Sequence, residues 1–178
     1  MESTYLQKIL AGRNRNPTIV GIRHQIGLCR ETHWLDDVNR WLGKRVNLGD
    51  KVMLEIPEYP LGDSLNVVPT RVKLYMKCLV DHLEQIGAEI IPGEDKQRWG
   101  IDNFYHDEYV RDNEVFIPRM REIKPRFFLV GYSHLDYLKE KMPEFSYVNL
   151  VNEEKDEKTS PWLNVNFNKY NLSAISKK

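Results

Sequence analysis

Two histidines in this chain follow apolar runs that share one pattern. Residues 18–24 read TIVGIRH and residues 127–134 read FFLVGYSH, so both runs end in Gly-x-x-His. An imidazole changes its charge near neutral pH, and it can act as a general base or as a metal ligand. A third expected strand, residues 51–56, ends in Glu55-Ile56 before Pro57, so a carboxylate lies near its end. Two imidazole nitrogens and one carboxylate form a ligand set that suits a divalent transition metal.

We therefore predict His24, Glu55 and His134 as metal ligands. Water bound at an open metal position is acidified and can attack a polarised carbonyl, so Glu55 is also a candidate catalytic carboxylate. Simpler roles exist for the same residues. A histidine at the end of a strand often faces solvent, and Glu55 could cap a helix or pair with Arg23.

Arg111 is the second candidate catalytic residue. It opens the segment Arg111-Asp112-Asn113, which leads into an expected helix before residues 127–131. A guanidinium aimed at the site would bind a substrate carboxylate or stabilise a developing oxyanion. The alternative is an ordinary surface salt bridge.

The elements that must position these residues alternate between strand and helix. Short β-branched or aromatic runs predict strands, whereas apolar residues at helical spacing predict helices. The expected strands are 18–23, 51–56, 88–92, 127–131 and 147–151, and the expected helices are 31–45, 68–86, 109–123 and 135–142. This order predicts a single-domain α/β fold with a mostly parallel central sheet and helices on both faces. The first and fourth strands should be neighbours, because ligands bind at carboxyl ends where the strand order reverses.

Composition limits the partners and the compartment. The chain has 178 residues, 26 basic and 26 acidic side chains, and two cysteines without metal or redox spacing. A balanced charge gives no general attraction to nucleic acid or to an anionic membrane. No apolar run approaches the roughly 20 residues that a spanning helix needs. We expect a soluble cytoplasmic protein with a small-molecule or peptide substrate, and leave open whether it forms a homodimer.

The expected domain covers residues 1–154. A charged linker and a C-terminal arm follow in residues 155–178, where Leu163, Val165 and Phe167 alternate with asparagines. This alternation is typical of an edge strand or of an arm that needs a partner.

The candidate residues together resemble the TraB/Tiki superfamily, which includes the erythromycin esterase-like and ChaN-like proteins. The resemblance rests on the paired Gly-x-x-His motifs (Gly21 to His24 and Gly131 to His134), on Glu55 at the end of the second strand and on the Arg111 to Asn113 element. It runs from about Thr18 to Val151.

This resemblance implies an α/β fold in which the motif His, Glu and Arg residues gather at one end of the sheet. Members of the superfamily include manganese- or cobalt-dependent proteases, macrolide esterases, haem-binding proteins and proteins that act on peptide pheromones. We therefore expect a metal-assisted hydrolase of peptide or ester bonds that uses manganese, cobalt or zinc. The alternative is a non-catalytic protein that binds a small anionic molecule, a peptide or a haem-like ligand in the same cleft.

Overall fold

A five-stranded, all-parallel sheet forms the centre of the molecule. The computed structural model describes residues 16–22, 31–68, 70–101 and 107–150. The strands stand in the order β3-β2-β4-β1-β5. Their bounds are Thr18–Ile22 for β1, Lys51–Leu54 for β2, Glu89–Pro92 for β3, Phe127–Gly131 for β4 and Ser146–Asn149 for β5. The predicted fold class is confirmed, and so is the pairing of the first strand with the fourth.

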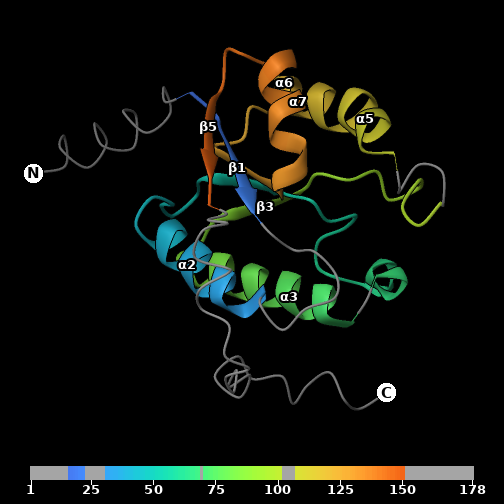
Figure 1. The fold of residues 1–178 in the computed structure, drawn as a ribbon. Coiled ribbons are helices and arrows are strands. Elements are labelled where there is room, and N and C mark those ends of the chain that lie inside the picture. The colour runs from blue at the N-terminus through green and yellow to red at the C-terminus, as the bar shows by residue number, and fades with distance from the viewer. Residues whose placement is uncertain (1–15, 23–30, 69, 102–106, 151–178) are drawn as a thin grey trace, which may run out of the picture.

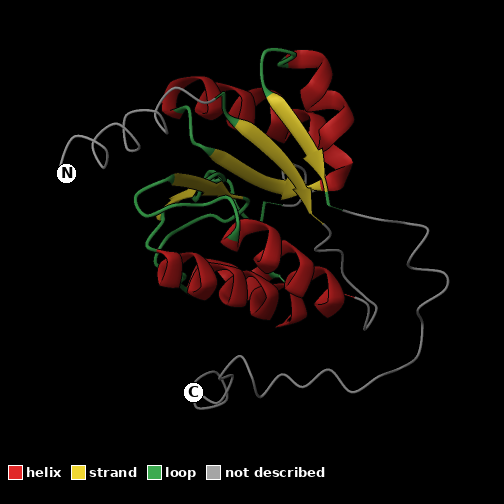
Figure 2. Ribbon diagram, turned by 90° about the vertical axis from the view of Figure 1, so that its left-hand side faces the viewer, coloured by secondary structure: helices red, strands yellow, loops and turns green. Residues whose placement is uncertain are grey.

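Helices cover both faces of this sheet (Figure 1). One layer holds α2 (Glu31–Gly43) and α3 (Thr70–Ile86), and the other holds α5 (Glu108–Arg111), the π-helical turn η2 (Asp112–Phe116), α6 (Ile117–Ile123) and α7 (Leu135–Lys141). Short 3₁₀ turns form η1 (Asp63–Val67) and η3 (Tyr132–His134). Figure 2 shows the strands between the two layers. None of the helices in the described ranges is long and apolar enough to cross a membrane.

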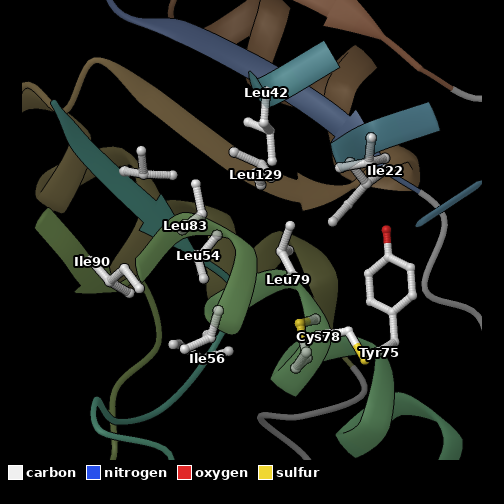
Figure 3. Packing of buried hydrophobic residues seen from close by; sticks show 14 of the residues in the cluster. Ile22, Leu42, Leu54, Ile56, Tyr75, Cys78, Leu79, Leu83, Ile90 and Leu129 are labelled. Atoms are coloured by element: carbon white, nitrogen blue, oxygen red, sulfur yellow. The ribbon is translucent and has the colours of Figure 1, made fainter. Parts of the chain in front are cut away.

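Alternation along the strands divides the core into two clusters, because successive side chains of a strand point to opposite faces. On the α2–α3 side, Leu54 of β2 and Leu129 of β4 lie in one buried cluster with Leu79 and Leu83 of α3 (Figure 3). On the other side, Phe128 of β4 packs edge-to-face against Phe116, with ring centroids 5.1 Å apart. The central strands β1, β2 and β4 are therefore largely buried on both faces, as is typical of a parallel sheet covered by helices.

Several expected boundaries shift by one or two residues. The second strand ends at Leu54 because the N–H of Ile56 turns back to the carbonyl of Leu54, at 2.8 Å. The long apolar stripe begins as a helix at Thr70 and ends before Gly87, whose φ of +79° favours glycine after a helix. The last strand runs from Ser146 to Asn149.

The expected helix 109–123 is three consecutive pieces. Between α5 and α6, the N–H of Ile117 donates to the carbonyl of Asp112, five residues back, which defines the π turn. Pro118 lies in the first turn of α6, where its missing N–H is tolerated. The expected single helix is therefore interrupted, and the interruption is a wider turn that precedes Pro118.

The order of the strands in the sheet reverses at β4. This strand lies between β1 and β2, and the helix that follows it, α7, covers the opposite face from α2 and α3, which follow β1 and β2. Connections that leave neighbouring strands toward opposite faces open a crevice at the carboxyl ends. The predicted site residues are expected at this edge.

Candidate functional site

Five charged or titratable side chains are buried at the carboxyl ends of the strands. Their exposed fractions are 6% for Glu55, 1% for Glu94, 5% for Arg111, 1% for Asp112 and 2% for His134. Charged side chains are rarely buried unless they are paired, so the contacts among these five decide whether the cluster is stable.

Glu55 joins the ends of β2 and β4. Its backbone N–H donates to the carbonyl of Leu129, at 3.2 Å, which continues the strand pairing for one residue. Its Oε2 accepts the backbone N–H of Gly131, at 2.7 Å. Its Oε1 accepts a hydrogen bond from Nη2 of Arg111. Both oxygens of Glu55 are therefore held by donors from other elements.

Glu94 reaches the same point from β3. The N–H of Gly93 donates to Leu54 at 2.7 Å, and the N–H of Glu94 donates to Ile56 at 3.1 Å, so the ends of β2 and β3 are fastened together. A Cβ on Gly93 would lie 2.6 Å from the backbone oxygen of Leu54, which explains why this position is glycine. The Oε1 of Glu94 accepts a hydrogen bond from Arg111.

Arg111 links the two glutamates through one nitrogen. Its Nη2 donates to both Glu55 and Glu94. The guanidinium carbon lies 5.3 Å from the ring centroid of Phe116, within the range of a cation–π contact. Burial alone would lower the pKa of Arg111, but the charges of Glu55 and Glu94 raise it above the ordinary range. The guanidinium is therefore the fixed positive charge of the cluster.

Asp112 and His134 form the second half of the cluster. The Nδ1 of His134 lies 2.7 Å from Oδ1 of Asp112, and its Nε2 lies 3.8 Å from Oε1 of Glu55. The edge of the Phe116 ring packs against the imidazole, with centroids 5.5 Å apart. Asp112 opens the π turn, a feature that is often found at functional sites. This turn buries both Arg111 and Asp112, although they are consecutive in sequence.

Polar contacts at the rim hold the helices that carry this pair. Asn113 of η2 and Tyr137 of α7 exchange two hydrogen bonds, of 2.7 and 3.0 Å. The hydroxyl of Ser133 donates to Glu108 of α5, at 2.9 Å. These contacts fix η2 against α7 and so keep Asp112 opposite His134.

The surroundings shift the pKa values of the pair in one direction. For His134, burial lowers the pKa, but the hydrogen bond to Asp112 and the charges of Glu55 and Asp112 outweigh it, so the pKa is raised above its ordinary value. For Asp112, burial raises the pKa more than the contact with His134 lowers it. Both groups therefore hold protons more strongly than they would in water.

The pKa of Glu94 is raised well above the ordinary value of a glutamate. Burial raises its pKa to about 7, and the charge of Glu55 adds to this, while Arg111 opposes it. Among the described residues, no donor lies within hydrogen-bond distance of its buried Oε2. One of the two oxygens of Glu94 is therefore uncompensated.

The structure brings together Glu55, Arg111 and His134, three of the four predicted site residues. The fourth, His24, lies outside the described residues; β1 ends two residues earlier, at Ile22, which pairs with Gly131. Glu94 and Asp112 were not among the predicted site residues. The signal for Glu94 was its place directly after a strand, like that of Glu55. For Asp112 it was the place next to Arg111.

The buried side chains can be compared with the known geometry of metal sites. In His134 the Nδ1 is hydrogen-bonded to the carboxylate of Asp112, and metal-binding histidines often show such a contact while the other nitrogen binds the metal. However, both oxygens of Glu55 already accept hydrogen bonds. Within the described ranges, no three His, Cys, Asp or Glu side chains are grouped to hold a metal ion. The described donors alone do not fit a metal, and the ligand set His24, Glu55 and His134 stays a prediction.

Comparison with protein-family models, with curated proteins and with solved structures finds no significant match to this chain. The resemblance to the TraB/Tiki superfamily therefore rests on the motifs themselves.

Proposed function

We propose that this chain is a hydrolase of ester or amide bonds in which His134 is the general base. The observation that carries the proposal is the hydrogen bond between Nδ1 of His134 and Asp112, which leaves Nε2 directed toward the carboxylate of Glu55. A base held in one tautomer by a buried carboxylate is the arrangement that activates a water or a hydroxyl nucleophile.

The reaction needs only groups of this cluster for its proton transfers. Nε2 of His134 takes a proton from water while the water oxygen adds to the substrate carbonyl carbon. The imidazolium then lies between Asp112 and Glu55, and these two negative charges stabilise it. When the bond to the leaving oxygen or nitrogen breaks, the imidazolium returns the proton to that atom. All five side chains are buried, so the proposal requires this site to open before a substrate can reach Nε2 of His134.

Glu55 has a positioning role in this proposal. Its two oxygens are held by Gly131 and Arg111, so it is not the group that takes the proton from water. Its charge faces Nε2 and favours the protonated imidazole. A metal bound through His24, Glu55 and His134 is a separate prediction from the sequence, and the reaction described above does not depend on it.

The test is hydrolysis of a panel of 4-nitrophenyl esters and amino-acid 4-nitroanilides by the purified full chain. His134→Gln should reduce the rate by about a hundredfold or more, the usual contribution of a general base. His82→Gln is the control, because His82 lies on α3 and contacts the carbonyl of Asn39 at 2.9 Å, away from the cluster. Each protein is assayed with a chelator and with added manganese.

The outcomes separate the candidate functions. Chelator-resistant hydrolysis that depends on His134 supports the proposal. Hydrolysis that requires manganese replaces it with the metal-assisted reaction. If His134→Gln keeps the wild-type rate, or if no member of the panel is hydrolysed, the general-base role is wrong.

A further inference from the structure

A second bridge lies beside the contact between Asp112 and His134. Asn113 follows Asp112 in η2, and Tyr137 of α7 lies one helical turn after His134. Nδ2 of Asn113 donates to the hydroxyl of Tyr137 at 2.7 Å, and this hydroxyl donates to Oδ1 of Asn113 at 3.0 Å. Two consecutive residues of η2 are therefore tied to the segment that carries His134, one inside the cluster and one at its rim.

The segment that carries Asp112 depends on contacts with other elements. The π turn interrupts the regular hydrogen bonds between α5 and α6, and α5 itself has only four residues. Isolated helices of this length are marginal, so packing against the rest of the fold must hold them in place. The proposed reaction also requires the buried site to open, so the base and its carboxylate need a contact at the rim that keeps them aligned.

The ring of Tyr137 has partners of its own. It packs edge-to-face against Tyr109 of α5, with ring centroids 4.9 Å apart, and Nζ of Lys141 lies 5.2 Å from its centroid. Nδ2 of Asn113 also donates to the carbonyl of Tyr109, at 2.8 Å. The hydroxyl of Tyr137 therefore meets an amide group that is itself fixed, and one oxygen atom connects α7 to η2.

We propose that Tyr137 is a positioning residue of the hydrolase proposed above, and that its hydroxyl acts through Asn113 to keep Asp112 aligned with His134. The hydroxyl takes no part in the proton transfers. This inference rests on the general-base role of His134 and adds the residue that determines how often the base is aligned. Loss of the hydroxyl should therefore lower turnover and leave substrate affinity nearly unchanged.

The test is Tyr137→Phe in the full chain, because phenylalanine keeps the ring and removes only the hydroxyl. For a panel ester that the wild type hydrolyses, kcat should fall about fivefold, in line with the net effect of one hydrogen bond, while KM stays close to the wild-type value. Asn113→Ala should have the same effect. The combined variant should lose no more than either single one, because both changes remove the same bridge.

Tyr147→Phe is the matched control. The hydroxyl of Tyr147 lies 2.8 Å from the carbonyl oxygen of Leu138 and 2.9 Å from that of Met142, so this variant also removes hydrogen bonds to the α7 region, but from β5. Its kcat should stay close to that of the wild type. A fall as large as in Tyr137→Phe would show a general effect of loosening α7 and would overturn the inference.

A second comparison asks whether Tyr137 acts through Asp112. In the Asp112→Asn background, Tyr137→Phe should change kcat by less than about twofold, since the contact that it positions is already lost. An equal loss in both backgrounds means that the two residues act independently, and this result also overturns the inference.

The tautomer of His134 gives a measurement that does not need activity. At a pH where the imidazole is neutral, the ring ¹⁵N resonances should place the proton on Nδ1 in the wild type and show a mixture of tautomers in Tyr137→Phe. If no panel member is hydrolysed, the mixture supports the positioning role while the enzyme is rejected, and an unchanged tautomer rejects both. Hydrolysis that depends on His134 but is unchanged in Tyr137→Phe supports the enzyme and rejects the inference.

Discussion

Asp112 holds His134 through Nδ1 at 2.7 Å, although 22 positions separate the two residues and they lie on different elements. The π turn η2 presents the carboxylate, and the 3₁₀ turn after β4 presents the imidazole. This contact fixes which ring nitrogen faces Glu55. The chemistry proposed for the site depends on it directly.

Asp112→Asn should lower the pKa of His134, because the variant removes a negative charge and changes the hydrogen bond that raises this pKa. NMR titration of the imidazole in both proteins measures the change. Hydrolysis should fall by a factor of about a hundred or more, since an amide no longer fixes the tautomer or stabilises the imidazolium. Asp136→Asn, at an exposed position of α7, is the control. A pKa that stays unchanged in Asp112→Asn contradicts the pairing.

Glu94→Gln should change how stability depends on pH. The pKa of Glu94 rises from 4.5 to about 7 on folding, so between these values the folded chain holds a proton that the unfolded chain releases. The free energy of unfolding of the wild type therefore falls as pH rises through this range. One pKa unit corresponds to about 1.36 kcal/mol, so the ionisation of Glu94 lowers the free energy of unfolding by about 3 kcal/mol over this pH range.

Urea denaturation of both proteins at pH 5 and pH 8 measures this effect. The difference between the variant and the wild type should shift in favour of Glu94→Gln at the higher pH, because glutamine does not titrate. A difference that is the same at both pH values would show that Glu94 is ionised over the whole range.

Arg111→Met should reduce the free energy of unfolding by about 3–5 kcal/mol, because it leaves two buried carboxylates without their cation. Arg111→Lys should lie between this variant and the wild type, since a lysine supplies the charge but not the planar guanidinium. Arg40→Met is the control, because Arg40 pairs with Asp37 on an exposed surface of α2 and should cost less than about 1 kcal/mol. A loss from Arg111→Met as small as that from the control would mean that the buried pairing is weak.

Gly21→Ala should destabilise the fold through Leu135. A Cβ at Gly21 would lie 2.3 Å from Cδ1 of Leu135, which is only 9% exposed. Overpacking of this kind typically costs about 1–3 kcal/mol. Chemical denaturation of Gly21→Ala, of Leu135→Val and of the double variant measures the coupling between the two positions. The double variant should cost less than the sum of the single ones, and strict additivity would contradict the steric explanation.

The strands and the long helix could be predicted because their signals are local. The run Phe127 to Gly131 is apolar throughout, and all five residues are buried. The stripe that begins near Val68 shows helical spacing up to the glycine at position 87. The alternation of strands and helices then predicts a parallel sheet, since parallel strands need crossover connections.

The site could be predicted only in part, because its residues depend on neighbours in space. Glu55 and His134 were found from their places at strand ends. Glu94 also follows a strand, but only the pairing of β2 with β3 brings it to Arg111. Asp112 was missed because consecutive residues of a regular helix point about 100° apart. Apart from Pro118, no residue in this part of the sequence indicates the π turn that buries both Arg111 and Asp112.

The π turn also fixes the number of residues that this part of the chain can contain. Five residues, Asp112 to Phe116, close the wide turn before α6. Removing one of them would restore an ordinary helix, but it would rotate everything before the deletion by about 100° and draw it about 1.5 Å closer to α6. Arg111 would then leave the two glutamates, while the helix itself became more regular. Natural variants that keep this cluster should therefore tolerate substitutions at the exposed position Glu114, but no insertion or deletion between Arg111 and Pro118.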